Sequence, residues 1–175
     1  MKRMIGTLAV CLLAICSQAQ SAGKTDPSSK KTVGFVENFD QAKKEAVAFK
    51  QPIFALFTGS DWCPWCVRLH TEILEKEAFK TYAAGNLILF EADFPRAKKQ
   101  SSEIKNQNQS LAQRYGVEGF PTVVLMDASG KELGRTGYER GGADAYVASL
   151  KDLLKKAGVK TEGATVSASS SADKK

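Results

Sequence analysis

The most informative segment of this chain reads Phe57-Thr58-Gly59-Ser60-Asp61-Trp62-Cys63-Pro64-Trp65-Cys66. Its first residue, Phe57, is also the last residue of the apolar run 53–57, and such a continuous apolar run is typical of a strand covered on both faces. After it, apolar residues return with the spacing of one helix face, at positions 66, 69, 73 and 74. The two thiols therefore stand where a strand passes into a helix, and this arrangement indicates electron exchange between thiols and disulfides.

The first residues have the pattern of a secretory signal peptide. Lys2 and Arg3 lead into the apolar run 4–15, and small residues follow at the two positions that a signal peptidase reads. The run is too short to span a bilayer as a stable helix. We expect cleavage after Ala19, with a site two or three residues later as the alternative, and export to the periplasm or the medium. An uncleaved membrane anchor is less favoured.

Cleavage changes the cysteine count. Cys11 and Cys16 leave with the signal, and only Cys63 and Cys66 remain in the exported chain. A disulfide that closes such a short loop constrains the unfolded chain little, so it adds little stability. The pair is better explained by chemistry than by a structural role.

Charge and length narrow the function classes. Loss of Lys2 and Arg3 leaves 23 of the 25 basic residues against 19 acidic ones, so the formal charge falls from +6 to +4. The basic residues are spread along the chain, which disfavours nucleic-acid binding. We expect a signal peptide at 1–19, a flexible lead-in at 20–31, one folded domain at 32–158 and a disordered tail at 159–175.

Within the domain, helical and strand patterns alternate. Helical spacing occurs over 39–49, after Cys66, and in a final helix at positions 146, 150, 153 and 154. Apolar runs predict strands at 53–57, 87–90 and 121–126, with a partner strand at 131–136. We expect a polar connection at 95–109, a short helix at 110–115, and Ser60 or Asp61 as acceptors at the start of the helix after the thiols. These elements predict an α/β protein with a central mixed sheet flanked by helices.

Three features together resemble the thioredoxin fold. They are the order of elements, Trp-Cys-Pro-Trp-Cys at 62–66, and Gly119-Phe120-Pro121-Thr122 at a later strand. The resemblance covers roughly 33–157 and is closest to secreted single-domain thioredoxin-like proteins. It implies a thiol-disulfide oxidoreductase that needs no cofactor.

The residues support the same roles. Cys63 would face the helix N-terminus, where unpaired N–H groups favour a thiolate, so we expect it to be the nucleophile. Cys66 lies about one turn deeper and would resolve the mixed disulfide. Pro64 suits the first turn of a helix, where its missing N–H costs nothing.

The resemblance also implies a substrate-binding ledge. Pro121 matches the family's cis proline beside the disulfide, and the backbone of Phe120 would pair with an extended substrate. An ordinary proline at an edge strand is the alternative. Trp62, Pro64 and Trp65 complete the predicted substrate-binding surface; a core position is the alternative for Trp62, whereas Trp65 is expected to be exposed.

Other polar positions carry weaker predictions. Thioredoxins resemble one another in a buried acid six positions before the first cysteine, and here that position is Phe57, so water or another group must take the proton from Cys66. His70 follows Cys66 by one turn and is expected at a solvent edge or in the core, with modulation of the thiols as the alternative. A zinc site lacks a fourth ligand, so we predict no metal. Glu91 and Asp93 are expected at a solvated strand end, with a place near the active edge of the sheet as the alternative.

We therefore expect an exported enzyme that exchanges disulfides with protein cysteines. A membrane-bound redox protein is the favoured electron partner, and we expect a monomer. The direction stays open between reduction, oxidation and isomerisation. The alternative is a thioredoxin-fold binding or chaperone module with little redox activity.

Overall fold

A computed structural model describes residues 31, 32 and 34–159, so the predictions for the signal peptide, for the lead-in up to residue 30 and for the tail from residue 160 lie outside the described residues. Five strands form one sheet in the order β1-β3-β2-β4-β5. They are β1 (Phe35–Val36), β2 (Ile53–Thr58), β3 (Ile88–Asp93), β4 (Thr122–Met126) and β5 (Glu132–Thr136). The first three strands in the sheet order are parallel, whereas β4 runs antiparallel to both β2 and β5. The predicted mixed sheet is confirmed.

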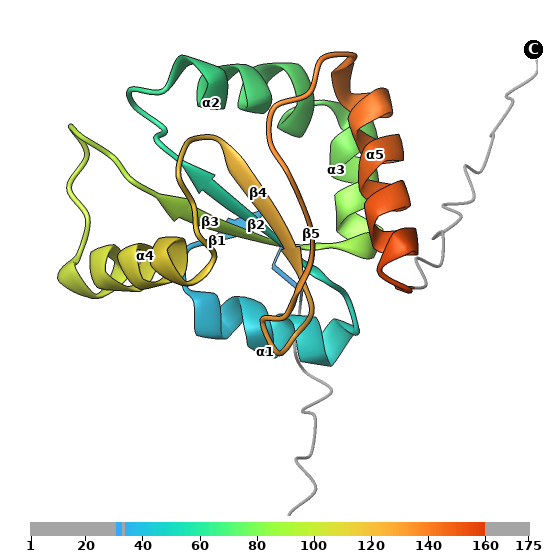
Figure 1. Ribbon diagram of the computed structural model, residues 1–175, viewed down its shortest axis with the longest axis horizontal. Helices are drawn as coiled ribbons and strands as arrows, with labels where there is room; N and C mark the ends of the chain where they lie inside the picture. Colours follow the sequence, from blue (N-terminus) through green and yellow to red (C-terminus); the bar gives the residue numbers. More distant parts are fainter. Residues whose placement is uncertain (1–30, 33, 160–175) are drawn as a thin grey trace, which may run out of the picture.

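Helices cover both faces of this sheet (Figure 1). One face carries α1 (Phe39–Phe49) and α4 (Ser102–Arg114). The other carries α2 (Pro64–Leu69), the π-helical turn η1 (His70–Leu74), α3 (Glu77–Asn86) and α5 (Gly142–Lys156). Within the described residues, no helix has the length and apolar character needed to cross a membrane.

Strand β2 is the centre of the fold, and all of its residues are buried. Side chains alternate between the two faces of a strand. Phe54 and Leu56 accordingly pack with α3 and α5, while Ile53 and Phe57 pack with α1 and α4. Burial on both faces explains the continuous apolar run. It also fixes the end of β2, from which the chain continues to the two cysteines.

The predicted polar connection at 95–109 is wrong for most of its length. Helix α4 begins at Ser102, and the hydroxyl of Ser101 caps it by accepting a hydrogen bond from the N–H of Ile104 at 3.3 Å. Asn108 and Leu111 are the buried residues of this helix. Because so few residues of this helix are buried, apolar residues do not recur along it at helical spacing. The apolar spacing of the sequence therefore predicted only its last turn.

Two further differences concern the elements around the thiols. The short strand β1 was not predicted, because two residues carry no detectable alternation. The helix expected after Cys66 is observed as α2 followed directly by η1, whereas α3 was not predicted and begins after Lys76, which is extended. This break turns the chain so that Leu69, Ile73 and Phe79 reach the same core.

Candidate active site at the junction of β2 and α2

Cys63 is the N-cap of α2. Its backbone is extended, with φ −93° and ψ 110°, and its sulfur accepts a hydrogen bond from the N–H of Cys66 at 3.2 Å. Pro64 occupies the first turn, as predicted. The sulfur of Cys63 therefore meets a backbone donor of the kind that stabilises a thiolate at a helix start. The predicted capping by Ser60 or Asp61 is wrong, since Cys63 itself takes that position.

Cys66 lies deeper than Cys63 and differs from it electrostatically. It is 1% exposed, and burial raises its pKa to about 11, with a smaller contribution from the hydrogen bond to Cys63. The backbone of Gly59 and the side chain of Thr58 act in the opposite direction and lower this pKa. The two sulfurs form no disulfide in this structure. The arrangement offers one thiol at the helix start and a second, protonated thiol beneath it.

The segment 119–122 lies beside Cys63. The thiol of Cys63 donates to the carbonyl oxygen of Phe120 at 3.6 Å, and the peptide bond between Phe120 and Pro121 is cis. The hydroxyl of Thr122 donates to the carbonyl of Gly119 at 2.8 Å and fixes this turn. The structure thus brings Cys63 together with Phe120 and Pro121, which lie 57 or more residues after it in the sequence.

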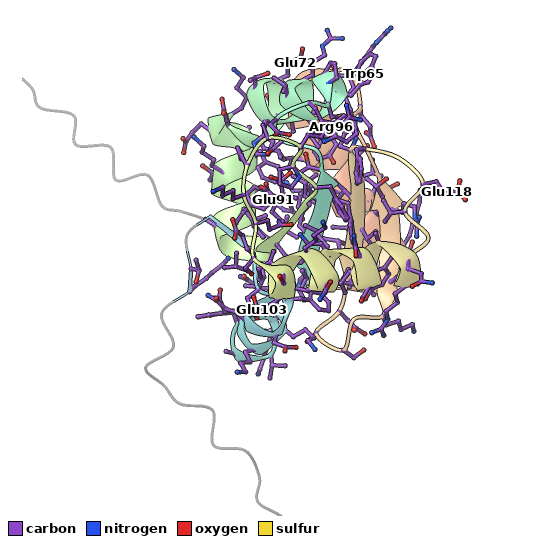
Figure 2. All side chains as sticks on the ribbon, turned by 90° about the vertical axis from the view of Figure 1, so that its left-hand side faces the viewer. Trp65, Glu72, Glu91, Arg96, Glu103 and Glu118 are labelled. Atoms are coloured by element: carbon purple, nitrogen blue, oxygen red, sulfur yellow. The ribbon has the colours of Figure 1, made fainter. Side chains whose placement is uncertain are left out.

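The two tryptophans take different positions. Trp62 is half-buried: its indole N–H donates to the carbonyl of Phe94 at 2.8 Å, and its ring packs edge-on against Phe120 at 5.8 Å. Trp65 is 47% exposed, as predicted, and lies beside Tyr138 with 5.4 Å between ring centroids. The guanidinium of Arg96 covers the Trp62 ring at 4.0 Å. Figure 2 shows Trp65 and Arg96 at the same end of the molecule.

Asp61 holds the loop that carries Arg96. Its carboxylate accepts hydrogen bonds from the N–H groups of Arg96, Ala97 and Lys98 at 2.7–3.2 Å, and these bonds lower the pKa of Asp61. Ser60 is fixed similarly, because its N–H and its hydroxyl both donate to Asp93. The sequence did not reveal these contacts, since no local pattern links residues 35 positions apart.

The position of the missing acid is fully apolar. Phe57 is buried on the α1 and α4 face, where its ring lies 6.3 Å from that of Tyr115. Among the described residues, no group of three or more histidine, cysteine or acidic side chains gathers as a metal site.

His70 and Glu91 form a second polar site, in which the histidine and carboxylate lie 3.9 Å apart. The expected solvated strand end is wrong for Glu91, which lies in mid-strand and is half-buried. Burial, followed by the charges of Asp93 and Glu37, raises the pKa of Glu91 to about 7. Burial also lowers the pKa of His70. Both groups are therefore driven towards their neutral forms.

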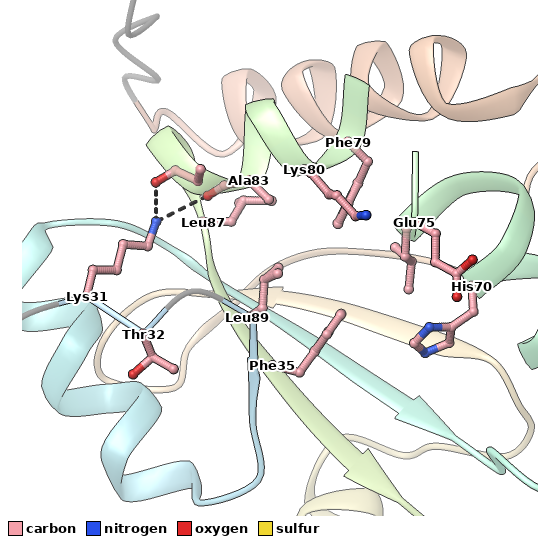
Figure 3. A pocket seen from close by; sticks show the side chains of 13 residues that line it. Lys31, Thr32, Phe35, His70, Glu75, Phe79, Lys80, Ala83, Leu87 and Leu89 are labelled. Atoms are coloured by element: carbon pink, nitrogen blue, oxygen red, sulfur yellow. Dashed lines mark hydrogen bonds between the residues drawn. The ribbon is translucent and has the colours of Figure 1, made fainter. Parts of the chain in front are cut away.

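His70 also lines an apolar cavity of about 350 Å³ at the β1 edge (Figure 3). Phe35, Leu74, Phe79 and Leu89 form much of its wall. Neither cysteine lines the cavity, so it is separate from the thiol site.

Comparisons with known proteins agree with this geometry. Residues 39–153 match the family model described as a thioredoxin-like domain. The disulfide bond reductase DsbH of Chlamydia pneumoniae is 37% identical over 149 residues, which cover 85% of this chain and 89% of that protein. The thioredoxin-related protein DsbJ of Chlamydia pneumoniae is 22% identical over 162 residues and is covered over 46% of its length.

Solved structures show the same fold. A DsbH oxidoreductase superposes with a TM-score of 0.67 at 37% identity, covering 78% of this chain and 94% of that chain. A thioredoxin from Thermus thermophilus has a TM-score of 0.55 at 19% identity, with 73% and 92% covered. The predicted thioredoxin fold is confirmed, and the chain belongs to the thioredoxin-like family as a thiol-disulfide oxidoreductase.

Proposed function

We propose that this protein reduces disulfide bonds of other proteins, with Cys63 as the nucleophile and Cys66 as the resolving thiol. The observation that carries the proposal is the position of Cys63 at the start of α2, where its sulfur accepts from the N–H of Cys66. The 37% identity to a disulfide bond reductase supports reduction over oxidation or isomerisation.

The reaction proceeds by two thiol exchanges. The Cys63 thiolate attacks one sulfur of a substrate disulfide, forms a mixed disulfide and releases the other substrate sulfur as a thiolate, which takes up a proton. Cys66 loses its proton and attacks the sulfur of Cys63, and the first substrate sulfur leaves as a thiol. The substrate gains two electrons and the chain becomes the Cys63–Cys66 disulfide. Its return to the dithiol requires a second dithiol protein, for which we propose a membrane-bound redox partner.

The substrate binds along the surface that flanks Cys63. Phe120 and Pro121 are half-exposed beside the sulfur, so an extended segment can pair with the backbone of Phe120 while Pro121, which lacks an N–H, shapes the groove. Pro64 and Trp65 are exposed on one side, and Trp62 is half-exposed on the other. These apolar groups suit the flank of a partly unfolded cysteine-containing segment, and we expect the protein to act as a monomer.

Equilibration in graded glutathione buffers tests the direction. Reduction is supported by a potential near that of a dedicated reductant, about −270 mV, and contradicted by one near a strong oxidant, about −120 mV. Alkylation with a mass tag at mildly acidic pH tests the roles. Both sulfurs are buried, but Cys63 alone should react quickly, because it lies at the helix start whereas burial raises the pKa of Cys66. Equal and slow labelling of both thiols would instead favour a binding module.

We also propose that the chain acts outside the cytoplasm, after removal of residues 1–19, with the folded domain at 32–158 between two flexible ends. The charged and apolar pattern of residues 2–15 supports export. Fractionation of producing cells, with mass spectrometry of the intact chain, measures the cleavage site. A chain that keeps residue 1 in the soluble cytoplasmic fraction would contradict the proposal.

A further inference from the structure

Thr58 is the last residue of β2, and its side chain is enclosed. It is 1% exposed. By strand alternation it lies on the same face as Leu56, which is the face covered by α2 and η1, while Phe57 points to the opposite face. The strand thus delivers a hydroxyl, and no carboxylate, beneath the helix that carries the thiols.

The hydroxyl of Thr58 is buried and meets no hydrogen-bond partner within the described residues. Such a group is costly, because a buried donor that gives up water and finds no partner loses about 1–3 kcal/mol. The group that it influences is Cys66. The side chain of Thr58 and the N–H of Gly59 both lower the pKa of this thiol, against the larger effect of burial.

We propose that the hydroxyl of Thr58 donates a hydrogen bond to the sulfur of Cys66 as this sulfur becomes the attacking thiolate in the resolving step. The inference rests on the proposed function. A hydroxyl donates more strongly to a thiolate than to a thiol, so this bond is strongest when the charge develops.

In this proposal the hydroxyl of Thr58 assists Cys66 in a different way from the acid that thioredoxins have at the position of Phe57. A carboxylate would accept the proton of Cys66, whereas Thr58 stabilises the thiolate that remains after the proton has passed to water. The sulfur then attacks Cys63, the Cys63–Cys66 bond forms, and the bond from Cys63 to the substrate breaks. Thr58 itself neither gains nor loses a proton.

A reaction with 5,5′-dithiobis(2-nitrobenzoic acid) separates the two thiol steps. The full chain carries Cys11→Ser and Cys16→Ser, so that only the active-site pair reacts. Attack by Cys63 releases one thionitrobenzoate, and attack by Cys66 on the resulting mixed disulfide releases the second. The two absorbance phases are recorded from pH 6 to 10 for the parent, Thr58→Val, Thr58→Ala and Thr58→Ser.

We expect both hydroxyl-free variants to slow the second phase roughly three- to tenfold near neutral pH and to shift its pH midpoint upward, with the first phase unchanged. Thr58→Ser should keep the parent's second phase. Tyr82→Phe removes another buried hydroxyl without a partner and should change neither phase. A second phase that is unchanged without the hydroxyl, or equally slow in Thr58→Ser, overturns the role of Thr58. A slow first phase in the parent contradicts the proposed function instead.

Discussion

The thiol end of the sheet and its β1 edge are held together by different contacts. At the thiol end, the polar groups of Ser60, Asp61 and Trp62 each bond to residues of the segment 93–98. At the β1 edge, Phe35 and Leu89 wall an apolar cavity of about 350 Å³.

The comparison shows that the region with the open cavity is not the region that carries the thiols. A cavity with apolar walls can hold an apolar group, but it offers few donors that could stabilise a developing charge. At the junction of β2 and α2 the side chain of Cys63 is buried, yet the N–H of Cys66 donates a hydrogen bond to its sulfur. Chemistry is therefore expected where donors converge on a sulfur, and the variants below test this contrast.

The largest effect is expected at Cys63. Cys63→Ser replaces the attacking thiol with a hydroxyl that does not form a thiolate, so disulfide reduction should fall to the background rate. Cys66→Ser should instead keep the first exchange and accumulate a mixed disulfide with the substrate, which intact mass spectrometry detects. If Cys63→Ser still reduced disulfides above the background rate, the nucleophile would be another residue, and the thiol end would no longer differ from the β1 edge in its chemistry.

A smaller effect is expected from packing at Gly59. A Cβ at this position would lie 2.5 Å from the Trp62 ring, so Gly59→Ala must displace the indole that packs against Phe120. We expect a loss of up to about 3 kcal/mol in the free energy of unfolding, measured by urea denaturation, and a changed Trp fluorescence. Gly134→Ala is the matched control, because its Cβ would meet Leu153 at an ordinary 3.5 Å. Equal stabilities of the two variants would contradict the close packing.

The features that could be predicted from the sequence have local signals. The run 53–57 predicts β2, and the apolar spacing after Cys66 predicts residues that the structure buries at Leu69, Ile73 and Leu74. Pro64 at the helix start follows from its fixed φ and missing N–H. The proximity of Phe120 to Cys63 came from the family resemblance, since periodicity carries no information on contacts between distant residues.

The features that could not be predicted depend on tertiary contacts. Asp61 is a good helix cap by type, but its carboxylate binds the backbone of a loop that is 35 residues away. Glu91 reads as a strand-end acid, but β3 extends to Asp93 and His70 lies over the carboxylate at 3.9 Å. His70 begins a π-helical turn, and the spacing of apolar residues does not predict such a turn.

Glu91 lies between the two regions and gives a pH-dependent effect. Its pKa in the folded chain is about 7, above the ordinary 4.5, so the folded state binds its proton more tightly. The stability that this proton contributes is present below about pH 4.5 and is lost as the pH rises through about 7. Glu91→Gln removes the loss and should be about 1–2 kcal/mol more stable than the parent at pH 8, but not at pH 4.5.

Urea denaturation at several pH values measures this difference. The neighbouring charges of Asp93, Glu37 and Lys98 stay in place in the variant, so the difference reports the Glu91 proton together with any change at His70, which lies 3.9 Å away. A stability difference that is constant from pH 4.5 to 8 would show that Glu91 titrates normally.

The smallest effect is expected at the β1 edge. Ala83 is 2% exposed and lines the cavity, so Ala83→Leu adds apolar volume to a space that can receive it. Filling a cavity commonly stabilises a protein by about 0.5–2 kcal/mol, and we expect a gain near the lower end because the cavity is open to solvent. Disulfide reduction should match the parent, since neither cysteine lines this space. If Ala83→Leu folded normally but slowed reduction, the cavity would be coupled to the thiols, and the separation of the two regions would be wrong.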